Sequence, residues 1–348
     1  MPVPNARRAL YRTGLAAMAL LAFFAAGFAT RPAPSQGAAT EELASRPTWE
    51  QLMGRSVQAR KAGAVRDSEA LLEEATALVN SFGPNDLRRA HHRLGQAEFH
   101  LWSGRPELAE PAYRDAVRIG ESIVGGDHPE MISLLEGLAN FYYYREQYDD
   151  AMPIFMRLLN IVRAARPYDP HEEARRLRNL AQLERLRGRH ENATSFHLQA
   201  LKLVEGSPRA SAGEVAEYLQ GAAESYLAWG RARLAQPLAT RSVALIETLA
   251  GPESLDVVPH LKTLAQATMD SGDPARAAKL HERAIAIVER VSGPAHSDLA
   301  PHLLGLATAL RSLDRMREAE LHAARAARVT RGPADSGPPT GVAGAERR

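Results

Sequence analysis

Apolar side chains recur at spacings of three and four residues through most of this chain, which is the pattern of helices that bury one face. A clear example is the run Leu134, Leu135, Leu138 and Tyr142. Gly-Pro pairs such as Gly251-Pro252 and Gly293-Pro294 separate the apolar stretches. Glycine allows the positive φ at which many helices end, and proline is tolerated where the next helix starts. The pattern predicts an all-α protein.

The helical pattern repeats with an almost constant period. One turn position is occupied in succession by Gly63, Gly104, Glu146, Gly188, Gly230, Gly272 and Asp314. The first step is 41 residues and the other five are 42 residues. Alanine or serine stands seven residues before and five residues after every turn position, so two antiparallel helices can approach closely there. A fixed period of this length predicts an α-α superhelix, or solenoid, of about seven helical hairpins in place of one closed core.

Composition and motifs narrow the function. The formal net charge is only +2, from 43 basic and 41 acidic residues, which argues against bulk binding of nucleic acid. The sequence has no cysteine and therefore no thiol chemistry. It also lacks the HExxH, GxSxG, GxxxxGK and GxGxxG motifs. We predict that the protein is not an enzyme and uses no cofactor.

The histidines tempt a metal interpretation, but structural roles explain them better. His128 lies between two repeats, where Asp127 can cap the following helix and Pro129 can occupy its first turn. His197 and His281 lie nine residues after their turn positions, where other repeats carry aromatic residues. We interpret these two as packing histidines, half-buried and hydrogen-bonded. No metal site is predicted.

The amino terminus predicts export. Arg7, Arg8 and Arg12 precede an uncharged apolar run from Gly14 to Ala29, which is the layout of a secretory signal, with small residues suited to cleavage after Ala29. As a helix this run would span roughly 24 Å, short of a hydrocarbon core of about 30 Å. We expect a periplasmic or secreted protein. The alternative is an uncleaved segment that anchors the protein in the inner membrane through residues 14–29 and leaves the repeats facing the periplasm.

Four segments are predicted in all. Residues 1–29 are the signal peptide or N-terminal membrane anchor, and residues 47–331 are the repeats. Residues 30–46 are rich in proline, glycine and small side chains, as are residues 332–348. Segments of such composition cannot bury enough apolar surface to fold alone, so we expect a flexible linker and a disordered tail.

Two stretches resemble a known repeat family. Asn179-Leu180-Ala181 followed by Gly188-Arg189-His190-Glu191-Asn192-Ala193 is similar to the "NLAxLY…QGRYxEA" pattern of kinesin-light-chain-type tetratricopeptide repeats. Gly126-Asp127-His128-Pro129 matches the linker of that 42-residue subtype. The resemblance covers roughly residues 46 to 331. It implies a scaffold that binds proteins or peptides, with the first helix of each hairpin lining a concave groove.

The resemblance also implies groove positions thirteen, ten, six, three and two residues before each turn position. The candidate groove residues are Trp102, Asn140, Tyr143, Tyr144, Arg175, Arg178, Gln182, Arg185, Gln220 and Glu224. The spacing of Arg175, Arg178 and Arg185 places them on one helical face independently of the family. They predict a basic groove centre that suits a peptide with acidic groups. In the competing interpretation this face is merely solvated and is neutralised by Glu136 and Glu217.

Three functions remain open. The first is an exported, non-catalytic scaffold that mediates protein–protein interaction by holding an extended partner segment in its groove. The second is a homo-oligomeric assembly module that stacks through its last repeat, where Leu303, Leu304 and Leu313 are apolar. The third is a carbohydrate-binding protein that uses Trp102 and the two groove tyrosines; no acid–base pair or nucleophile accompanies these rings. A membrane contact is expected only through an uncleaved amino-terminal segment.

Overall fold

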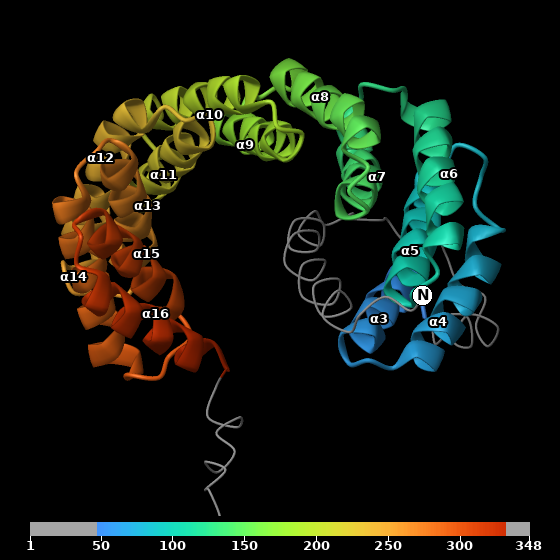
Figure 1. Ribbon diagram of the computed structural model, residues 1–348. Coiled ribbons are helices and arrows are strands. Elements are labelled where there is room, and N and C mark those ends of the chain that lie inside the picture. Colours follow the sequence, from blue (N-terminus) through green and yellow to red (C-terminus); the bar gives the residue numbers. More distant parts are fainter. Residues whose placement is uncertain (1–46, 332–348) are drawn as a thin grey trace, which may run out of the picture. The chain divides into compact units, whose positions relative to one another are not determined.

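Fourteen α-helices and one 3-10 turn make up the part of the chain that the computed structural model describes, residues 47–331 (Figure 1). The predicted segments 1–29, 30–46 and 332–348 lie outside these residues. The hairpins are α3 (Trp49–Lys61) with α4 (Val65–Val79), α5 (Arg88–Trp102) with α6 (Pro106–Val124), α7 (Ile132–Tyr144) with α8 (Tyr148–Ala164), α9 (Pro170–Leu186) with α10 (His190–Glu205), α11 (Ala212–Ala228) with α12 (Ala232–Ala250), α13 (Val257–Asp270) with α14 (Pro274–Ser292), and α15 (Leu299–Ser312) with α16 (Met316–Arg331). The 3-10 turn η1 (Pro129–Met131) precedes α7. The all-α solenoid of seven helical hairpins is confirmed.

The hairpins group into two compact units. The boundary falls between Tyr168 and Asp169, so the first unit contains α3 to α8 and the second contains α9 to α16. The sequence period, which continues through this boundary, predicts one array over residues 47–331 and gives no sign of the division. None of the helices in the described part is both long and apolar enough to cross a membrane.

Every predicted turn position has a positive φ, which is the backbone requirement that the sequence period reflects. Five of the seven positions are glycine, while Glu146 has a φ of 61° and Asp314 a φ of 58°. The residue after each turn position donates its backbone N–H to the carbonyl five residues earlier, as Arg105 does to His100 at 2.8 Å. This bond closes a Schellman-type helix end. Glycine adopts the required conformation without steric strain, so its recurrence marks the turns.

The two columns of small residues lie where the helices of each hairpin meet. All fourteen residues are at most 2 % exposed. Their burial follows from the close approach of the two backbones, which leaves no room for larger side chains. In the first hairpin the two columns hold Ser56 and Ser68, whose hydroxyls are hydrogen-bonded at 2.9 Å. A buried serine pair thus replaces the alanine pair and satisfies its own polar atoms.

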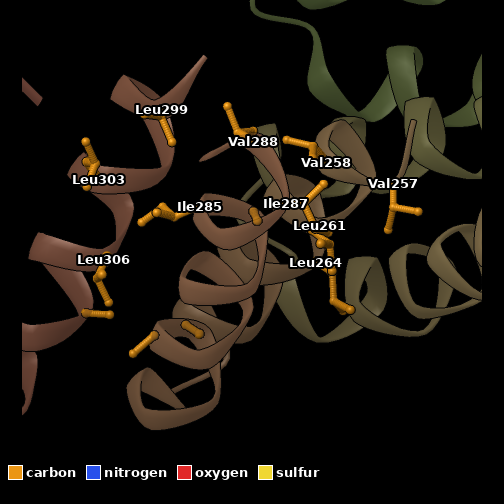
Figure 2. Packing of buried hydrophobic residues seen from close by; sticks show 14 of the residues in the cluster. Val257, Val258, Leu261, Leu264, Ile285, Ile287, Val288, Leu299, Leu303 and Leu306 are labelled. Carbon is orange, nitrogen blue, oxygen red and sulfur yellow. The ribbon is translucent and has the colours of Figure 1, made fainter. Parts of the chain in front are cut away.

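Within each unit, the second helix of one hairpin contacts the first helix of the next, and apolar side chains make most of these contacts. Figure 2 shows Ile285 on α14 facing Leu303 and Leu306 on α15. Ile285 lies thirteen residues after its turn position, and the two leucines lie eleven and eight residues before theirs. Each of the three side chains is at most 7 % exposed. These columns therefore form the core between repeats.

A large side chain nine residues after one turn position packs against a glycine nine residues before the next. A Cβ on Gly137 would come 3.0 Å from the Tyr113 ring, and one on Gly305 would come 2.2 Å from Nε2 of His281. Gly221 stands in the same relation to His197. These glycines are required for close approach and not for an unusual φ.

An arginine–glutamate pair also links neighbouring second helices. The arginine lies eleven residues after its turn position and the glutamate seventeen residues after the preceding one. The pairs are Arg157–Glu121, Arg241–Glu205, Arg283–Glu247 and Arg325–Glu289. Arg157, Arg283 and Arg325 also donate to a carbonyl of the preceding linker. Each pair fills the space between two second helices with a neutralised guanidinium.

Candidate peptide-binding surface

The predicted groove columns of neighbouring first helices face one another within each unit. In the first unit, Nε2 of His91 on α5 is 3.2 Å from the hydroxyl of Ser133 on α7, and both residues lie thirteen before their turn positions. In the second unit, α11 contacts α13, and α13 contacts α15. Figure 1 shows α9 and α11 along one side of the hairpins of that unit and α10 and α12 along the other. The first helices therefore form the layer that the resemblance implies.

The ten candidate groove residues are divided between the two units. Trp102, Asn140, Tyr143 and Tyr144 belong to the first unit and the other six to the second. Arg175 and Glu224 are exposed, and the remaining eight are half-buried. All ten can therefore present part of their side chain to a ligand, and none is a core residue.

The aromatic candidates of the first unit form small ring clusters. The Tyr143 ring lies 5.5 Å from that of Tyr144, edge to face, and 6.0 Å from that of Tyr148. Trp102 instead packs on Phe99, with ring centroids 6.2 Å apart. Partial burial raises the pKa of the Tyr144 phenol above its ordinary value, so this group is a neutral hydrogen-bonding residue at pH 7.

A polar pocket of about 340 Å³ lies between the amino-terminal halves of α9 and α11. Two candidate arginines line it, together with residues that the sequence analysis did not select. The lining residues are Asp169, His171, Glu172, Arg175, Arg178, Glu214, Glu217 and Tyr218. The sequence signal for the additional residues was the charge pair at i, i+3 formed by Glu172 and Arg175. Asp169 and His171 belong to the amino-terminal end of α9, and Glu214, Glu217 and Tyr218 come into the pocket from α11.

Carboxylates offset the arginines of this pocket. Arg175 is paired with Glu172, and a guanidinium nitrogen of Arg178 lies 3.7 Å from Oε2 of Glu217. His171 lies between the Glu214 carboxylate at 2.9 Å and the Ser207 hydroxyl at 2.6 Å. Four acidic residues thus accompany two arginines and one histidine. The expected basic centre is not found here, because α9 with its N-cap and the neighbouring helix α11 each supply two carboxylates.

Aromatic and amide groups complete the surface of the second unit. The Arg178 guanidinium lies over the Tyr218 ring, 5.4 Å from its centroid, in a cation–π contact. Nε of Arg185 donates to Oε1 of Gln182 at 3.1 Å. Gln220 donates to Glu224 at 3.0 Å. The amides of the two candidates Gln182 and Gln220 are therefore hydrogen-bonded within the surface and must exchange partners to bind a ligand.

The histidines have structural partners. Nδ1 of His128 accepts the backbone N–H of Glu130 at 3.3 Å, so His128 itself caps the turn at Pro129, and the predicted cap, Asp127, is wrong. His197 and His281 are 6 % and 5 % exposed, which is deeper than the half-burial we expected. Within residues 47–331 no cluster of three histidine or acidic side chains has the arrangement of a metal site.

Only one of the three leucines behind the assembly hypothesis presents most of an apolar side chain. Leu303 is fully buried between α14 and α15, and Leu313 is half-buried. Leu304 is 53 % exposed, and Leu321 on α16 is 70 % exposed. The exposed apolar area of the last hairpin therefore includes Leu304, which the sequence suggested, and Leu321, which it did not.

Comparison with known proteins agrees with this geometry. The sequence profile of the tetratricopeptide repeat family matches residues 93–164 and 257–331, which span α5 to α8 and α13 to α16. The chain carries tetratricopeptide repeats. They resemble the repeats of kinesin light chains, as the turn and linker residues suggested. No curated protein matches the chain in sequence.

Three solved structures share the tetratricopeptide fold. BtubC (BKLC) from P. vanneervenii has 20 % identity and a TM-score of 0.53, with 75 % of this chain and 96 % of that chain covered. The nearly identical TPR-like repeats of a protein assigned as a kinesin light chain in Podosopora anserina have 18 % identity and a TM-score of 0.52, with 60 % and 97 % covered. A signal transduction ATPase with numerous domains, PH0952 from Pyrococcus horikoshii, has 15 % identity and a TM-score of 0.63, with 80 % and 41 % covered. At these identities the likeness concerns the fold alone.

Proposed function

We propose that this chain is a non-catalytic scaffold that holds an extended segment of a partner protein on its first-helix surface. The tetratricopeptide fold supports a role in protein–protein interaction. The observation that carries the finer proposal is the pocket between α9 and α11, where Arg175 and Arg178 lie with Glu217 and Tyr218. PH0952, which has the same fold, is described as having a tetratricopeptide repeat sensor.

The ion pairs of this pocket are suited to exchange. Arg178 and Glu217 are 3.7 Å apart, and their side chains are 42 % and 66 % exposed. Exposed pairs of this kind contribute about 0–1 kcal/mol, so an incoming carboxylate can displace Glu217 at little cost. The guanidinium can then form a bidentate pair with the ligand while it remains over the Tyr218 ring. We therefore propose that the partner segment carries an acidic side chain or a terminal carboxylate.

The same proposal places the scaffold outside the cytoplasm. Its support is the basic and apolar sequence of residues 1–29, either cleaved or kept as an anchor. Fractionation of cells that produce the full-length chain tests it. Recovery from the periplasm at a mass lacking about 29 residues indicates cleavage, recovery with the inner membrane indicates an anchor, and recovery only from the cytoplasm refutes export.

A crosslinking pull-down in the native cells tests the groove. The variant Arg178→Ala/Arg185→Ala removes two of the four guanidiniums of α9, and Arg233→Ala removes an exposed one from the second helix α12 as a control. We expect one partner to be captured by the wild type and by the control but lost from the double variant, with helicity and melting temperature unchanged. Equal capture by all three forms would refute the groove assignment, and self-crosslinks alone would favour a homo-oligomeric assembly module.

A further inference from the structure

The junction between the first two hairpins departs from the apolar pattern of the other junctions. Eleven residues before the turn position, the other repeats carry a leucine that is at most 1 % exposed, namely Leu52, Leu135, Leu177, Leu219, Leu261 and Leu303. The second repeat carries Arg93 there. Eight residues before the turn, the third to seventh repeats carry buried leucine or alanine, and the second carries Gln96. Thirteen residues after the turn position, the sixth repeat carries Ile285 on α14, whereas the first repeat carries Thr76 on α4.

These replacements surround a cavity of about 450 Å³ in the first unit. Its lining residues include Val79, Phe82, Arg89, Arg93, Gln96 and Ile119. They come from α4, α5, α6 and the linker between α4 and α5. The lining includes two guanidiniums and no carboxylate. Both arginines lie on the side of α5 that faces α4, whereas the predicted groove residues of α5 lie on its other side.

The arginine–glutamate pair that fills the other second-helix junctions of the two units cannot form here. At this junction the arginine position holds Asp115 and the glutamate position holds Asn80. Asp115 lies outside the lining and bonds a guanidinium nitrogen of Arg93 at 3.0 Å. The hydrogen bond from Arg93 is the main cause that lowers the pKa of Asp115 below its ordinary value. The space that a neutralised guanidinium occupies elsewhere is left open.

The polar groups at the back of the cavity are already satisfied. Trp49 donates to Nδ1 of His92 at 3.4 Å, which leaves the proton of the neutral ring on Nε2 to be donated to Thr76 at 2.9 Å. The Thr76 hydroxyl in turn donates to the Leu72 carbonyl at 2.8 Å. Arg89, by contrast, donates to the Pro84 carbonyl at 3.1 Å, and the nearby Asp86 carboxylate, whose pKa the Arg89 charge helps to lower, is hydrogen-bonded through both oxygens by Arg88. The positive charge at the cavity mouth is therefore not fully neutralised.

We propose that this cavity binds a small organic oxyanion, with its carboxylate or phosphate held by Arg89 and Arg93 and its apolar part against Val79, Phe82 and Ile119. Two guanidiniums, of which only Arg93 forms an ion pair with a carboxylate, that of Asp115, suit a planar or tetrahedral oxyanion. Asn80 and Gln96 add amide donors beside it. The site is independent of the groove surface, because it uses different residues and the opposite face of α5, and the pocket between α9 and α11 belongs to the other unit.

Calorimetric titration of the full-length protein at pH 7 and constant ionic strength tests the site. The probes are sodium hexanoate and inorganic phosphate, and the neutral control is 1-hexanol. Binding of hexanoate alone shows that the apolar part is needed, binding of phosphate alone shows that the oxyanion suffices, and both outcomes support the site. The absence of saturable heat with either anion, or equal binding of hexanol, overturns it.

Two variants use the internal repeats as a guide. Arg93→Leu restores the leucine of the other six repeats, and Arg89→Met introduces the residue found at this column in the third repeat, Met131. We expect each to weaken anion binding by roughly tenfold or more, since a hydrogen bond to a charged group is lost, while the melting temperature is kept or raised. Arg66→Ala, which removes an exposed arginine of α4 outside the cavity, should leave binding unchanged. Unweakened binding in both variants would mean that the polar junction has no ligand.

Discussion

The buried histidine of the fourth hairpin makes the stability of the second unit depend on pH. His197 on α10 is 6 % exposed, and its Nδ1 is 2.7 Å from the hydroxyl of Ser225 on α11. Burial, aided by the charges of Arg178 and Arg185 on α9, lowers the pKa of His197 to about 4, from 6.5 for a free side chain. Because the folded pKa lies below the unfolded one, protonation favours the unfolded chain. This part of the stability is complete above pH 6.5 and is lost as the pH falls towards 4.

The magnitude follows from the two pKa values. At pH 5 the unfolded side chain carries nearly a full proton and the folded one about a tenth, so the free energy of unfolding falls by about 2 kcal/mol between pH 7 and pH 5. His281 and His302 in the same unit also have pKa values lowered to about 4 by burial. They should add losses in the same direction, so the wild-type unit is expected to lose stability steeply over this range.

A variant that copies residues from the other repeats removes one of these losses. His197→Phe introduces the aromatic found at this column in the third repeat, Phe155, and Ser225→Ala introduces the alanine found in the sixth, Ala267. The second change avoids an unpartnered hydroxyl, because Ser225 is 1 % exposed. The assay is urea unfolding followed by circular dichroism at pH 8, 7, 6 and 5.

We expect the double variant and the wild type to have parallel stabilities above pH 7 and to diverge below it. By pH 5 the variant should have lost about 2 kcal/mol less than the wild type. An identical pH dependence in the two proteins would refute the assignment of a titrating buried histidine. A difference already present at pH 8, and constant to pH 5, would show a packing effect in its place.

Six further substitutions, in three sets, test the turns and the contacts between repeats by the free energy of unfolding in urea. Glu146→Gly and Asp314→Gly should each raise the free energy of unfolding by about 0.5–1 kcal/mol, since both residues have a left-handed backbone. Gly230→Ala should lower the free energy of unfolding for the same reason. Unchanged stability of the two glycine variants would mean that local hydrogen bonds offset the strain. Gly305→Ala should lower the free energy by about 1–3 kcal/mol because its Cβ would clash with His281. A Cβ at Gly54 in α3 would meet nothing within 4 Å, so Gly54→Ala should raise the free energy of unfolding by about 1 kcal/mol. Equal effects of Gly305→Ala and Gly54→Ala would contradict the close-approach argument. Arg283→Ala should lower the free energy of unfolding by about 1 kcal/mol, because the ion pair with Glu247 is lost. If this loss of stability is as large in 1 M salt, packing and not charge is its cause.

The repeat and its helical hairpins can be read from the amino-acid sequence alone. The turn positions need a positive φ, and the small columns need short side chains where two backbones approach, so each requirement acts on one residue and leaves a mark at a fixed place in the period. For that reason the seven turns and the fourteen buried small residues could be located without a structure. Glu146 and Asp314 show that the position matters more than the glycine, since both adopt the same turn.

Which side chains meet depends on the packing of the helices in three dimensions. Arg178 and Glu217 are 39 residues apart in sequence, and their pairing depends on how far along α9 the helix α11 packs. A shift of one residue would turn either side chain away, which is why the expected basic centre could not be distinguished from a neutralised one. The division after Tyr168 is equally invisible in the period.

The cavity beside Arg93 combines both kinds of information. That an arginine stands where six repeats have leucine is visible in the sequence. Its meaning requires knowing that this column faces the preceding second helix, where Thr76 and Asn80 replace an aliphatic residue and a glutamate. Sequence periodicity shows which positions are equivalent, because each hairpin must meet the same local demands. The structure alone shows which positions share a cavity, because that depends on packing between residues distant in the chain.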